Sequence, residues 1–434
     1  MNKSNRRTFL RRAGLGVLAT DGFINLNPRA LGANESVSLA LIGARNQGRG
    51  VALRSITAGA RITMLCDIDD AINAKVSPEL EKAQGKAPEY VKDFRRVLDN
   101  KSVDAVIIAT PDHWHTQMAL LACQAGKDVF LEKPVSQTIR QGQLIRDAAR
   151  KYNRVMQIGT MRRSAEHFRT AAEYVASGKL GKICLIKAWM CQVRKSIGKP
   201  PDCPPPAGAD YDMWLGPAPK RPFNPNRFHY NWRFFWDYGN SELGNQGVHM
   251  LDVALWGIQM MRKTEKCLPT RVSGQGGIYW LDDAKEVPDT QVINYDFGDF
   301  LLVWELRSFN GGNAIEGTQA GTGFYGTEGA LIVDGNGWRA QSSQGEPGPT
   351  AGKSPFQHEK NFLECIKSRQ RPNADIEIGR LSTTLCHLGN IVHHLKRGVR
   401  FDPATETFPG DAEANVLLSE LGTAIHGPVA HPHA

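Results

Sequence analysis

The feature that most constrains the fold is a glycine-bearing turn that follows the first apolar run. Residues 37–42 (VSLALI) have the composition of a buried strand and lead directly into residues 43–50 (GARNQGRG). Gly43 and Gly48 stand where a strand–turn–helix unit needs residues without a Cβ. Arg45 occupies the place where a third glycine would normally let a pyrophosphate approach. This order of elements predicts a nucleotide-binding βαβ unit.

A second expected strand, residues 61–66, ends at Asp67, which lies 19 positions after Gly48. An acidic residue at this spacing can bind the ribose of an adenosine. Its carboxylate would repel the 2′-phosphate of NADP, so the sequence predicts NAD in preference to NADP. Arg45 has two open interpretations, because its guanidinium could contact the pyrophosphate or point to solvent. The residues expected to bind the cofactor here are Gly43, Arg45, Asn46, Gln47, Gly48 and Asp67.

Further apolar runs at 103–109, 127–131 and 154–158 alternate with helical stretches, as in a doubly wound parallel sheet. After residue 159 the strands become longer and alternate in polarity, which suits an open, mainly antiparallel sheet with one face toward a partner subunit. These strands are expected at 182–193, 270–281, 290–298, 300–308 and 313–319, with helices at 356–369 and 378–396. The predicted fold class is α/β: an N-terminal Rossmann domain followed by a C-terminal α+β domain.

The N-terminus has the pattern of a targeting segment. Residues 5–11 (NRRTFLR) resemble the twin-arginine export signal, and a weakly apolar stretch and small residues at 30–33 follow. The alternative is a basic N-terminus without a targeting role, since Asp21 interrupts the apolar stretch. The sequence thus predicts a signal peptide over 1–33 and a periplasmic or otherwise exported protein. It predicts a nucleotide-binding domain over 34–158, a catalytic and oligomerisation domain over 159–400 and a tail over 401–434.

The net charge of +9 does not indicate nucleic-acid binding. Residues 1–33 hold six basic residues and one acidic residue, so the rest of the chain carries a net charge of about +4. The chain contains no uninterrupted run of about 18 apolar residues, so the sequence predicts no membrane span. The eight cysteines form no CxxC pair. Cys191 and Cys203 could pair in an oxidising compartment, and the sequence leaves that question open.

Three later stretches carry a family resemblance: 106–115 (VIIATPDHWH), 126–134 (GKDVFLEKP) and 247–252 (GVHMLD). With shorter matches at 157–162 and 214–217, the chain resembles the glucose–fructose oxidoreductase / inositol dehydrogenase (Gfo/Idh/MocA) family from about residue 36 to about 400. The resemblance implies an enzyme that binds a nicotinamide cofactor, acts on a small carbohydrate or cyclitol and assembles as a dimer or tetramer.

The resemblance also implies catalytic roles. Lys133 of the Glu-Lys-Pro tripeptide is expected beside the reacting carbinol, where an ammonium would bind the oxygen and lower its pKa. His249 matches the general acid/base of the family. The family usually has an aspartate four positions earlier, where this chain has Asn245. An amide orients an imidazole without raising its basicity, so Asp252, about one helical turn on, is an alternative partner.

The segment 196–240 is an insertion that is first proline-rich and then aromatic, with residues 227–238 reading RFHYNWRFFWDY. Aromatic rings that cover sugar C–H faces, with polar groups between them, suit a carbohydrate pocket, although a core would use the same rings. The residues expected at the substrate are therefore His229, Tyr230 and Trp236, together with Arg162, Asn245 and Asp252. The motifs add these residues to the expected cofactor site: Thr110, Pro111, His113, Trp114, His115, Glu132, Lys133 and Gln157.

Three functions are compatible with these patterns. The leading hypothesis is an oxidoreductase that transfers a hydride between a hydroxyl of a sugar, sugar acid or cyclitol and a tightly bound NAD. The alternatives are a glycoside hydrolase that uses NAD in a redox-neutral cycle of oxidation, elimination, hydration and reduction, and a non-catalytic sugar-binding protein. No metal is predicted, because the histidine pairs 113/115 and 393/394 lack further ligands in the sequence.

Overall fold

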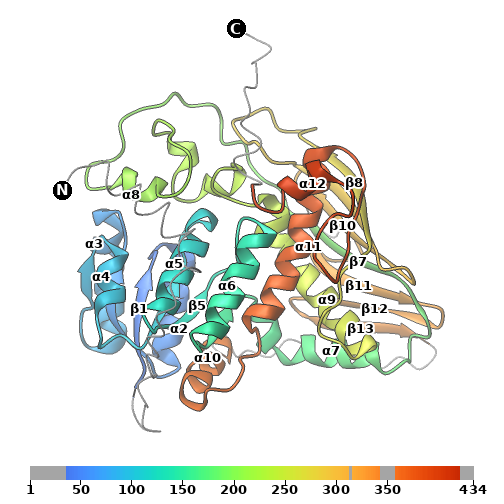
Figure 1. Cartoon of the computed structure of the whole chain (residues 1–434), viewed down its shortest axis with the longest axis horizontal. Coiled ribbons are helices and arrows are strands. Elements are labelled where there is room, and N and C mark those ends of the chain that lie inside the picture. The colour runs from blue at the N-terminus through green and yellow to red at the C-terminus, as the bar shows by residue number, and fades with distance from the viewer. Residues whose placement is uncertain (1–35, 312–314, 343–356, 421–434) are drawn as a thin grey trace.

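The computed structural model of the protein describes residues 36–311, 315–342 and 357–420. Two sheets lie side by side, and the helix α11 (Ile376–Leu395) runs between them (Figure 1). The expected signal peptide, residues 1–33, lies outside the described residues. The predicted fold class is confirmed, because a parallel sheet is followed by a mixed and mainly antiparallel one.

The first sheet has the strand order β3-β2-β1-β4-β5-β6, and all its pairs are parallel. Its central strands are buried throughout because helices cover both faces. The sequence did not predict β3, which has only three residues. The elements are β1 (Ser38–Ile42), α2 (Asn46–Thr57), β2 (Arg61–Cys66), α3 (Asp70–Gln84), β3 (Glu89–Val91), α4 (Phe94–Asp99), β4 (Ala105–Ile108), α5 (Asp112–Gln124), β5 (Asp128–Leu131), α6 (Ile139–Lys151) and β6 (Met156–Ile158).

The second sheet has the order β13-β12-β11-β7-β10-β9-β8-β14, and β7 and β10 form its one parallel pair within the described residues. Its strands are β7 (Ile183–Cys191), β8 (Arg271–Gly277), β9 (Thr290–Asp296), β10 (Leu301–Arg307), β11 (Ala320–Gly326), β12 (Gly329–Asp334), β13 (Gly337–Ser342) and β14 (Val399–Arg400). The helical elements of this half are η1 (Met161–Ser164), α7 (Glu166–Ala176), α8 (Tyr211–Leu215), η2 (Pro225–Arg227), η3 (Asn231–Phe234), η4 (Leu243–Gly247), α9 (Val248–Arg262), α10 (Gln357–Ser368), α11 and α12 (Ala412–Val416).

Two expectations about this half are corrected. Where a strand was expected at 313–319, the described residues 315–318 form a tight turn, closed by a bridge between Ile315 and Thr318, because Glu316 and Gly317 both adopt positive φ. The strand begins only at Ala320. Of the segment expected as a tail over 401–434, the described residues 401–420 pack on the sheet domain, since Phe401 and Phe408 lie in its core.

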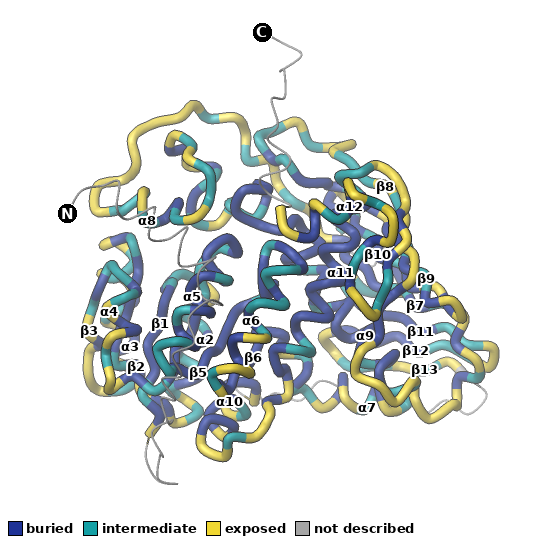
Figure 2. Tube along the Cα trace, viewed as in Figure 1, coloured by how far each residue is buried: buried dark blue, intermediate teal, exposed yellow. Residues whose placement is uncertain are grey.

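The helix α11 is buried along most of its length and joins the two cores (Figure 2). Its first residue, Ile376, packs in the core of the parallel sheet, and Leu381 to Val392 pack in the core of the second domain. The preceding α10 also returns to the first domain, where Phe362 packs under the sheet. In the described part of the chain, no helix is long and apolar enough to cross a membrane.

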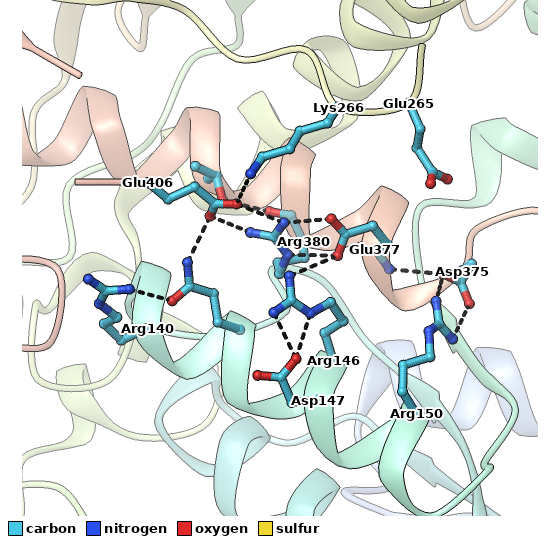
Figure 3. Close-up of polar contacts among 12 residues, drawn as sticks. Arg140, Arg146, Asp147, Arg150, Glu265, Lys266, Asp375, Glu377, Arg380 and Glu406 are labelled. Carbon is cyan, nitrogen blue, oxygen red and sulfur yellow. Dashed lines mark hydrogen bonds and ion pairs between the residues drawn. The ribbon is translucent and has the colours of Figure 1, made fainter. Parts of the chain in front are cut away.

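A buried ion-pair network fixes α11 to α6 and to the loop before α12 (Figure 3). Arg380 is 1% exposed and donates to Glu377 on its own helix and to Glu406 in the loop before α12. Gln143 of α6 donates to the same Glu406 carboxylate. Because each buried charge has an opposite partner and further hydrogen bonds, the network fixes α6, α11 and the C-terminal loop relative to one another.

Loss of the central cation should therefore be costly. Replacing Arg380 by Ala leaves the buried Glu406 carboxylate without its main partner, and we expect the free energy of unfolding to fall by about 3–5 kcal/mol. The matched control is Arg397→Ala, which removes an exposed arginine paired with Asp411 and Glu413. Thermal unfolding followed by circular dichroism measures both variants. Equal midpoints for R380A and the wild type would contradict the assignment.

Candidate active site

The turn after β1 has a geometry that only glycine permits at two positions. Gly43 adopts a φ of +85°, and a Cβ there would lie 2.7 Å from the Ala109 carbonyl oxygen. A Cβ on Gly48 would lie 2.0 Å from the Gly43 carbonyl oxygen. The turn therefore brings the N-terminus of α2 against the end of β4. The N–H groups of such a helix end favour the phosphates of a dinucleotide.

A pocket of about 100 Å³ lies at the ends of β1, β2 and β4. Asp67 lines it and accepts hydrogen bonds from Ala44 N (2.8 Å) and Asp69 N (3.1 Å). Burial raises the pKa of Asp67 to about 6, so the carboxylate form prevails at neutral pH. Arg45 and Lys92 also line the pocket, and Trp114 and Met118 contribute apolar walls. These residues fit an adenosine, whose base needs an apolar slot and whose ribose needs an acceptor.

The insertion 196–240 lies across this end of the nucleotide-binding domain (Figure 1). Backbone hydrogen bonds join Asp70 N to Gly208 O and Asp210 N to Ile68 O. The His229 Nε2 lies 2.9 Å from an Asp69 carboxylate oxygen. The aromatic rings of the insertion pack largely on one another in a separate core, which contains Trp214, Leu215, Phe223, Phe228, Phe234, Phe235, Trp236 and Tyr238. The insertion therefore covers the adenosine pocket, a position that the sequence did not predict.

A larger cavity of about 400 Å³ adjoins this pocket and shares Arg45, Ala109, Thr110, His229 and Trp232 with it. It lies between the two domains, because its walls come from both. The lining residues are Arg45, Asn46, Gln47, Ala109, Thr110, Asp112, Glu132, Lys133, Pro134, Met161, His229, Tyr230, Trp232, Arg233, Asn245, Gln246 and His249. The structure thus brings Lys133, Asn245 and His249 together, as the sequence predicted.

Lys133 lies two residues after β5 and reaches across to the second domain. Its Nζ donates to the Asn245 carbonyl oxygen (2.9 Å) and to Asn245 Oδ1 (3.3 Å). Burial lowers the pKa of Lys133, and the charge of Glu132 opposes that shift. The Glu132 carboxylate also accepts a hydrogen bond from Gln47 of α2 (2.8 Å). The ammonium is therefore fixed at the point where the nucleotide turn and the second domain meet.

His249 lies in the first turn of α9, directly after the π-helical turn η4. Such turns often occur at functional sites, because the extra residue redirects a side chain. Burial lowers the pKa of His249 well below its usual value, and the charges of Lys133 and Arg162 lower it further. The imidazole is therefore neutral at pH 7. Its Nδ1 atom is buried and has no hydrogen-bond partner among the described residues.

Asn245 is the centre of a polar network. Its Oδ1 accepts from Arg233 Nη1 (3.0 Å), and its Nδ2 donates to Glu242 Oε2 (3.1 Å). Glu242 in turn pairs with Arg194 (2.7 Å). The amide is suited to this place, because it offers an acceptor to two cations and a donor to a carboxylate. An aspartate at position 245 would face Glu242 without a donor between them.

Three residues expected at the substrate are not among the residues that line the cavity. Trp236 is buried, donates its ring N–H to the Glu286 carbonyl oxygen and packs against His394. The Asp252 carboxylate accepts from Arg163 (2.9 Å) and Ser382 (2.6 Å), so it joins η1 to α9 and α11. Arg162 lies over the Phe168 ring, 5.0 Å from its centroid.

Some residues expected at the cofactor also have structural partners. Gln157 is fully buried and donates to the His358 carbonyl oxygen. His113 bonds to the Trp214 carbonyl oxygen, and His115 lies between the carbonyl oxygens of Pro134 and Thr110. Gln157, His113 and His115 therefore stabilise the backbone around the site and do not line either cavity. Pro111 and Trp114 line the adenosine pocket, and His229 lines both cavities.

Sequence reasoning missed several lining residues, of which Asp112 and Arg233 carry charge. Asp112 belongs to the motif 106–115, from which its neighbours were predicted as cofactor-site residues. Its position shortly after a strand was the signal that could have identified it as a lining residue. Arg233 stands in the aromatic run, where irregular 3₁₀ turns hide which side chains share a face. Its guanidinium lies 4.1 Å from the Tyr230 ring centroid. Cys191 and Cys203 are free thiols, the first buried and the second exposed.

Comparison with known proteins agrees with this geometry. Residues 37–160 match the family model described as "Oxidoreductase family, NAD-binding Rossmann fold". Residues 189–305 and 345–425 match "Oxidoreductase family, C-terminal alpha/beta domain". The two models together cover most of the chain. The protein belongs to the Gfo/Idh/MocA oxidoreductase family.

Curated relatives match shorter parts of the chain. Glycosyl hydrolase family 109 protein 2 of Shewanella sp. (strain ANA-3) is 31% identical over 163 residues, which are 32% of this chain and 36% of that protein. The chain thus aligns with little more than a third of this relative's length. Levoglucosan dehydrogenase of Pseudarthrobacter phenanthrenivorans is 24% identical over 60% of this chain and 64% of that enzyme.

Solved structures share the fold over most of the chain. The aldose-aldose oxidoreductase of Caulobacter crescentus, complexed with glycerol, has a TM-score of 0.64 at 18% identity and covers 85% of this chain and 100% of its own. A levoglucosan dehydrogenase in complex with NADH and levoglucosan has a TM-score of 0.62 at 16% identity, over 84% and 99%. At these identities the likeness concerns the fold.

The glycine turn yields a direct test. In Gly48→Ala the new Cβ collides with the backbone of Gly43, so we expect at least a tenfold loss of dinucleotide affinity, about 1.4 kcal/mol. The matched control is Gly50→Ala in the same helix, where a Cβ meets only the end of the Arg54 side chain at 3.2 Å. Isothermal titration with NAD measures both variants. Equal affinity in G48A and G50A would show that the turn does not bind the dinucleotide.

Proposed function

We propose that the protein is an NAD-dependent oxidoreductase that transfers a hydride between a hydroxyl of a sugar, sugar acid or cyclitol and a tightly held nicotinamide cofactor. The observation that carries the proposal is the cavity between the domains. It contains an anchored ammonium, Lys133, and a neutral imidazole, His249, and it adjoins a pocket suited to adenosine.

The two side chains would divide the work at the hydroxyl. Lys133 Nζ would bind the hydroxyl oxygen and stabilise the negative charge that develops as its proton leaves. His249 is neutral at pH 7 because of its lowered pKa and would accept a hydrogen bond from that hydroxyl, which orients it. The nicotinamide, when bound along the glycine turn, supplies the acceptor for the hydride. The covered cavity would keep water from the reacting carbon.

A carbohydrate-sized substrate suits the rest of the lining. The cavity of about 400 Å³ presents the rings of Tyr230 and Trp232 together with the polar side chains of Gln246 and Arg233. Rings cover sugar C–H faces and polar groups bind hydroxyls. The dehydrogenase relatives named for inositol and levoglucosan support the same class.

Two features support NAD that is held tightly. Asp67 offers a carboxylate at the place of the adenosine ribose, which would repel a 2′-phosphate. Arg45 lies close to both Asp67 and Asp69, whose negative charges act on it, so its charge is partly balanced. The insertion covers the adenosine pocket through His229 and Trp214, so release of the cofactor would require this cover to move.

A redox-neutral glycoside hydrolase is the second candidate. Relatives named glycosyl hydrolase family 109 proteins are 31% identical over the aligned part. A covered cofactor favours this cycle too, because oxidation of a ring hydroxyl acidifies the adjacent C–H and a later reduction restores the same cofactor. The two candidates share the first step, so Lys133 and His249 would have the same roles in both.

Purified protein distinguishes these functions. We expect it to carry NAD that is released on heating, and to act on one of a panel of free sugars, myo-inositol, levoglucosan and aryl glycosides. NADH accumulation with a free polyol supports the dehydrogenase, whereas aglycone release without net NADH supports the glycosidase. A wild type that holds no NAD and converts none of these compounds would overturn both.

The variant Lys133→Met tests the central role. Removal of the ammonium should lower kcat/KM by about 10²- to 10⁴-fold while NAD content stays unchanged. Lys151→Met, on the exposed end of α6, is the matched control and should keep full activity. Turnover of K133M at the wild-type rate would exclude the mechanism.

Export through the twin-arginine route is the remaining part of the proposal, and it is supported by residues 5–11 and by a cofactor that would have to cross the membrane bound to a folded protein. Replacing Arg6 and Arg7 by Lys should leave the precursor in the cytoplasm, as fractionation and immunoblotting would show. Secretion of this variant at the normal level would contradict export by that route.

A further inference from the structure

Asp112 is an acidic residue in the wall of the cavity, and the proposed reaction assigns it no role. It is the first residue of α5, at the end of β4, and only 3% of its surface is exposed. Its Oδ2 accepts a hydrogen bond from Asn240 Nδ2 (2.9 Å). Its Oδ1 is also buried, and it has no partner among the residues that the structure describes. A carboxylate oxygen of this kind in a cavity wall is free to bind a proton or a donor.

The surroundings of Asp112 place its titration near neutrality. Burial raises the pKa of this carboxyl to about 7, while the bond from Asn240 and the charges of Lys133 and Arg233 lower it. On its own helix, His113 and His115 are neutral, because burial lowers the pKa of each to about 4. The groups that face Asp112 therefore come from the end of β5, from η3 and from the segment before η4.

His249 is an unfavourable acceptor for the proton that leaves a hydroxyl. An imidazolium at His249 would lie near the positive charges of Lys133 and Arg162, and both disfavour it. Its Nδ1 has no acceptor in the described part of the chain. Lys133 Nζ bonds to Asn245, which is an amide and cannot take a proton. A carboxylate elsewhere in the same wall would meet the need.

We propose that Asp112 holds this proton and acts through Lys133, an inference that rests on the proposed function. The hydroxyl proton passes to Lys133 Nζ as Lys133 gives one of its own protons, by way of water or a substrate hydroxyl in the cavity, to Asp112 Oδ1. The nicotinamide, when bound, would supply the acceptor for the hydride that leaves the carbon as the C=O bond forms. The alcohol, the oxidised cofactor and the carboxylate become the ketone, the reduced cofactor and the carboxylic acid, and Lys133 is an ammonium before and after.

The sign of the pH dependence follows. Oxidation of the alcohol needs the carboxylate form, so the rate should be lost as pH falls through about 7 in the wild type. Asp112→Asn has the same shape and keeps an acceptor for Asn240, but it cannot hold a proton. We expect its kcat for the compound found in the screen to fall about 10²-fold with KM unchanged, and the loss of rate near pH 7 to disappear. Asp99→Asn, at the exposed last residue of α4, is the matched control and should behave as the wild type.

A second measurement needs neither cofactor nor turnover. Aspartate carboxyls labelled with ¹³C are titrated by NMR in the cofactor-free protein, where one signal should titrate near pH 7 and be missing from D112N. If no such signal exists, or if D112N keeps the rate and pH profile of the wild type, the inference is overturned while the oxidoreductase proposal stands. A D112N that loses NAD affinity with kcat unchanged would also overturn it, because Asp112 would then only bind the cofactor. An inert, NAD-free wild type overturns the proposed function and leaves the NMR result readable.

Discussion

The hydrogen bonds from the Lys133 ammonium to Asn245 connect the two halves of this protein. Lys133 lies two residues after β5 of the nucleotide-binding domain, and Asn245 lies in the π-helical turn before α9. A half-buried ammonium needs oxygen acceptors, and here the second domain supplies them. The position of the cavity follows from this contact, because its walls are the two surfaces that meet there.

The identity of Asn245 follows from the same contact. Its oxygen accepts from Lys133 and Arg233, and its nitrogen donates to Glu242, which Arg194 neutralises. Only an amide satisfies both sides at once. With an amide at position 245, His249 Nδ1 has no hydrogen-bond partner among the described residues, and for this reason we place the proton on Asp112.

Two further features, the helix α11 and the insertion 196–240, hold the two domains in place around the cavity. The buried helix α11 crosses both cores and is fixed to α6 through Arg380 and Glu406. The insertion packs its aromatic rings on one another and lies across the adenosine pocket, where His229 meets Asp69. The helix α11 fixes the distance between the domains, and the insertion covers the adenosine pocket beside the cavity. Both are contacts between segments far apart in the chain.

The sequence alone determined the parts of the site that depend on local geometry. Gly43 and Gly48 could be recognised because a tight strand-to-helix turn leaves no room for a Cβ, and Asp67 because it directly follows a buried strand. Lys133 could be recognised through the Glu-Lys-Pro motif that the chain shares with its family. Tertiary structure alone decided which side chains of the insertion face the cavity, because its irregular turns have no period. It placed Tyr230 in the wall and Trp236 in a core. It also decided that Asp112 lines the cavity, since burial depends on what the second domain covers.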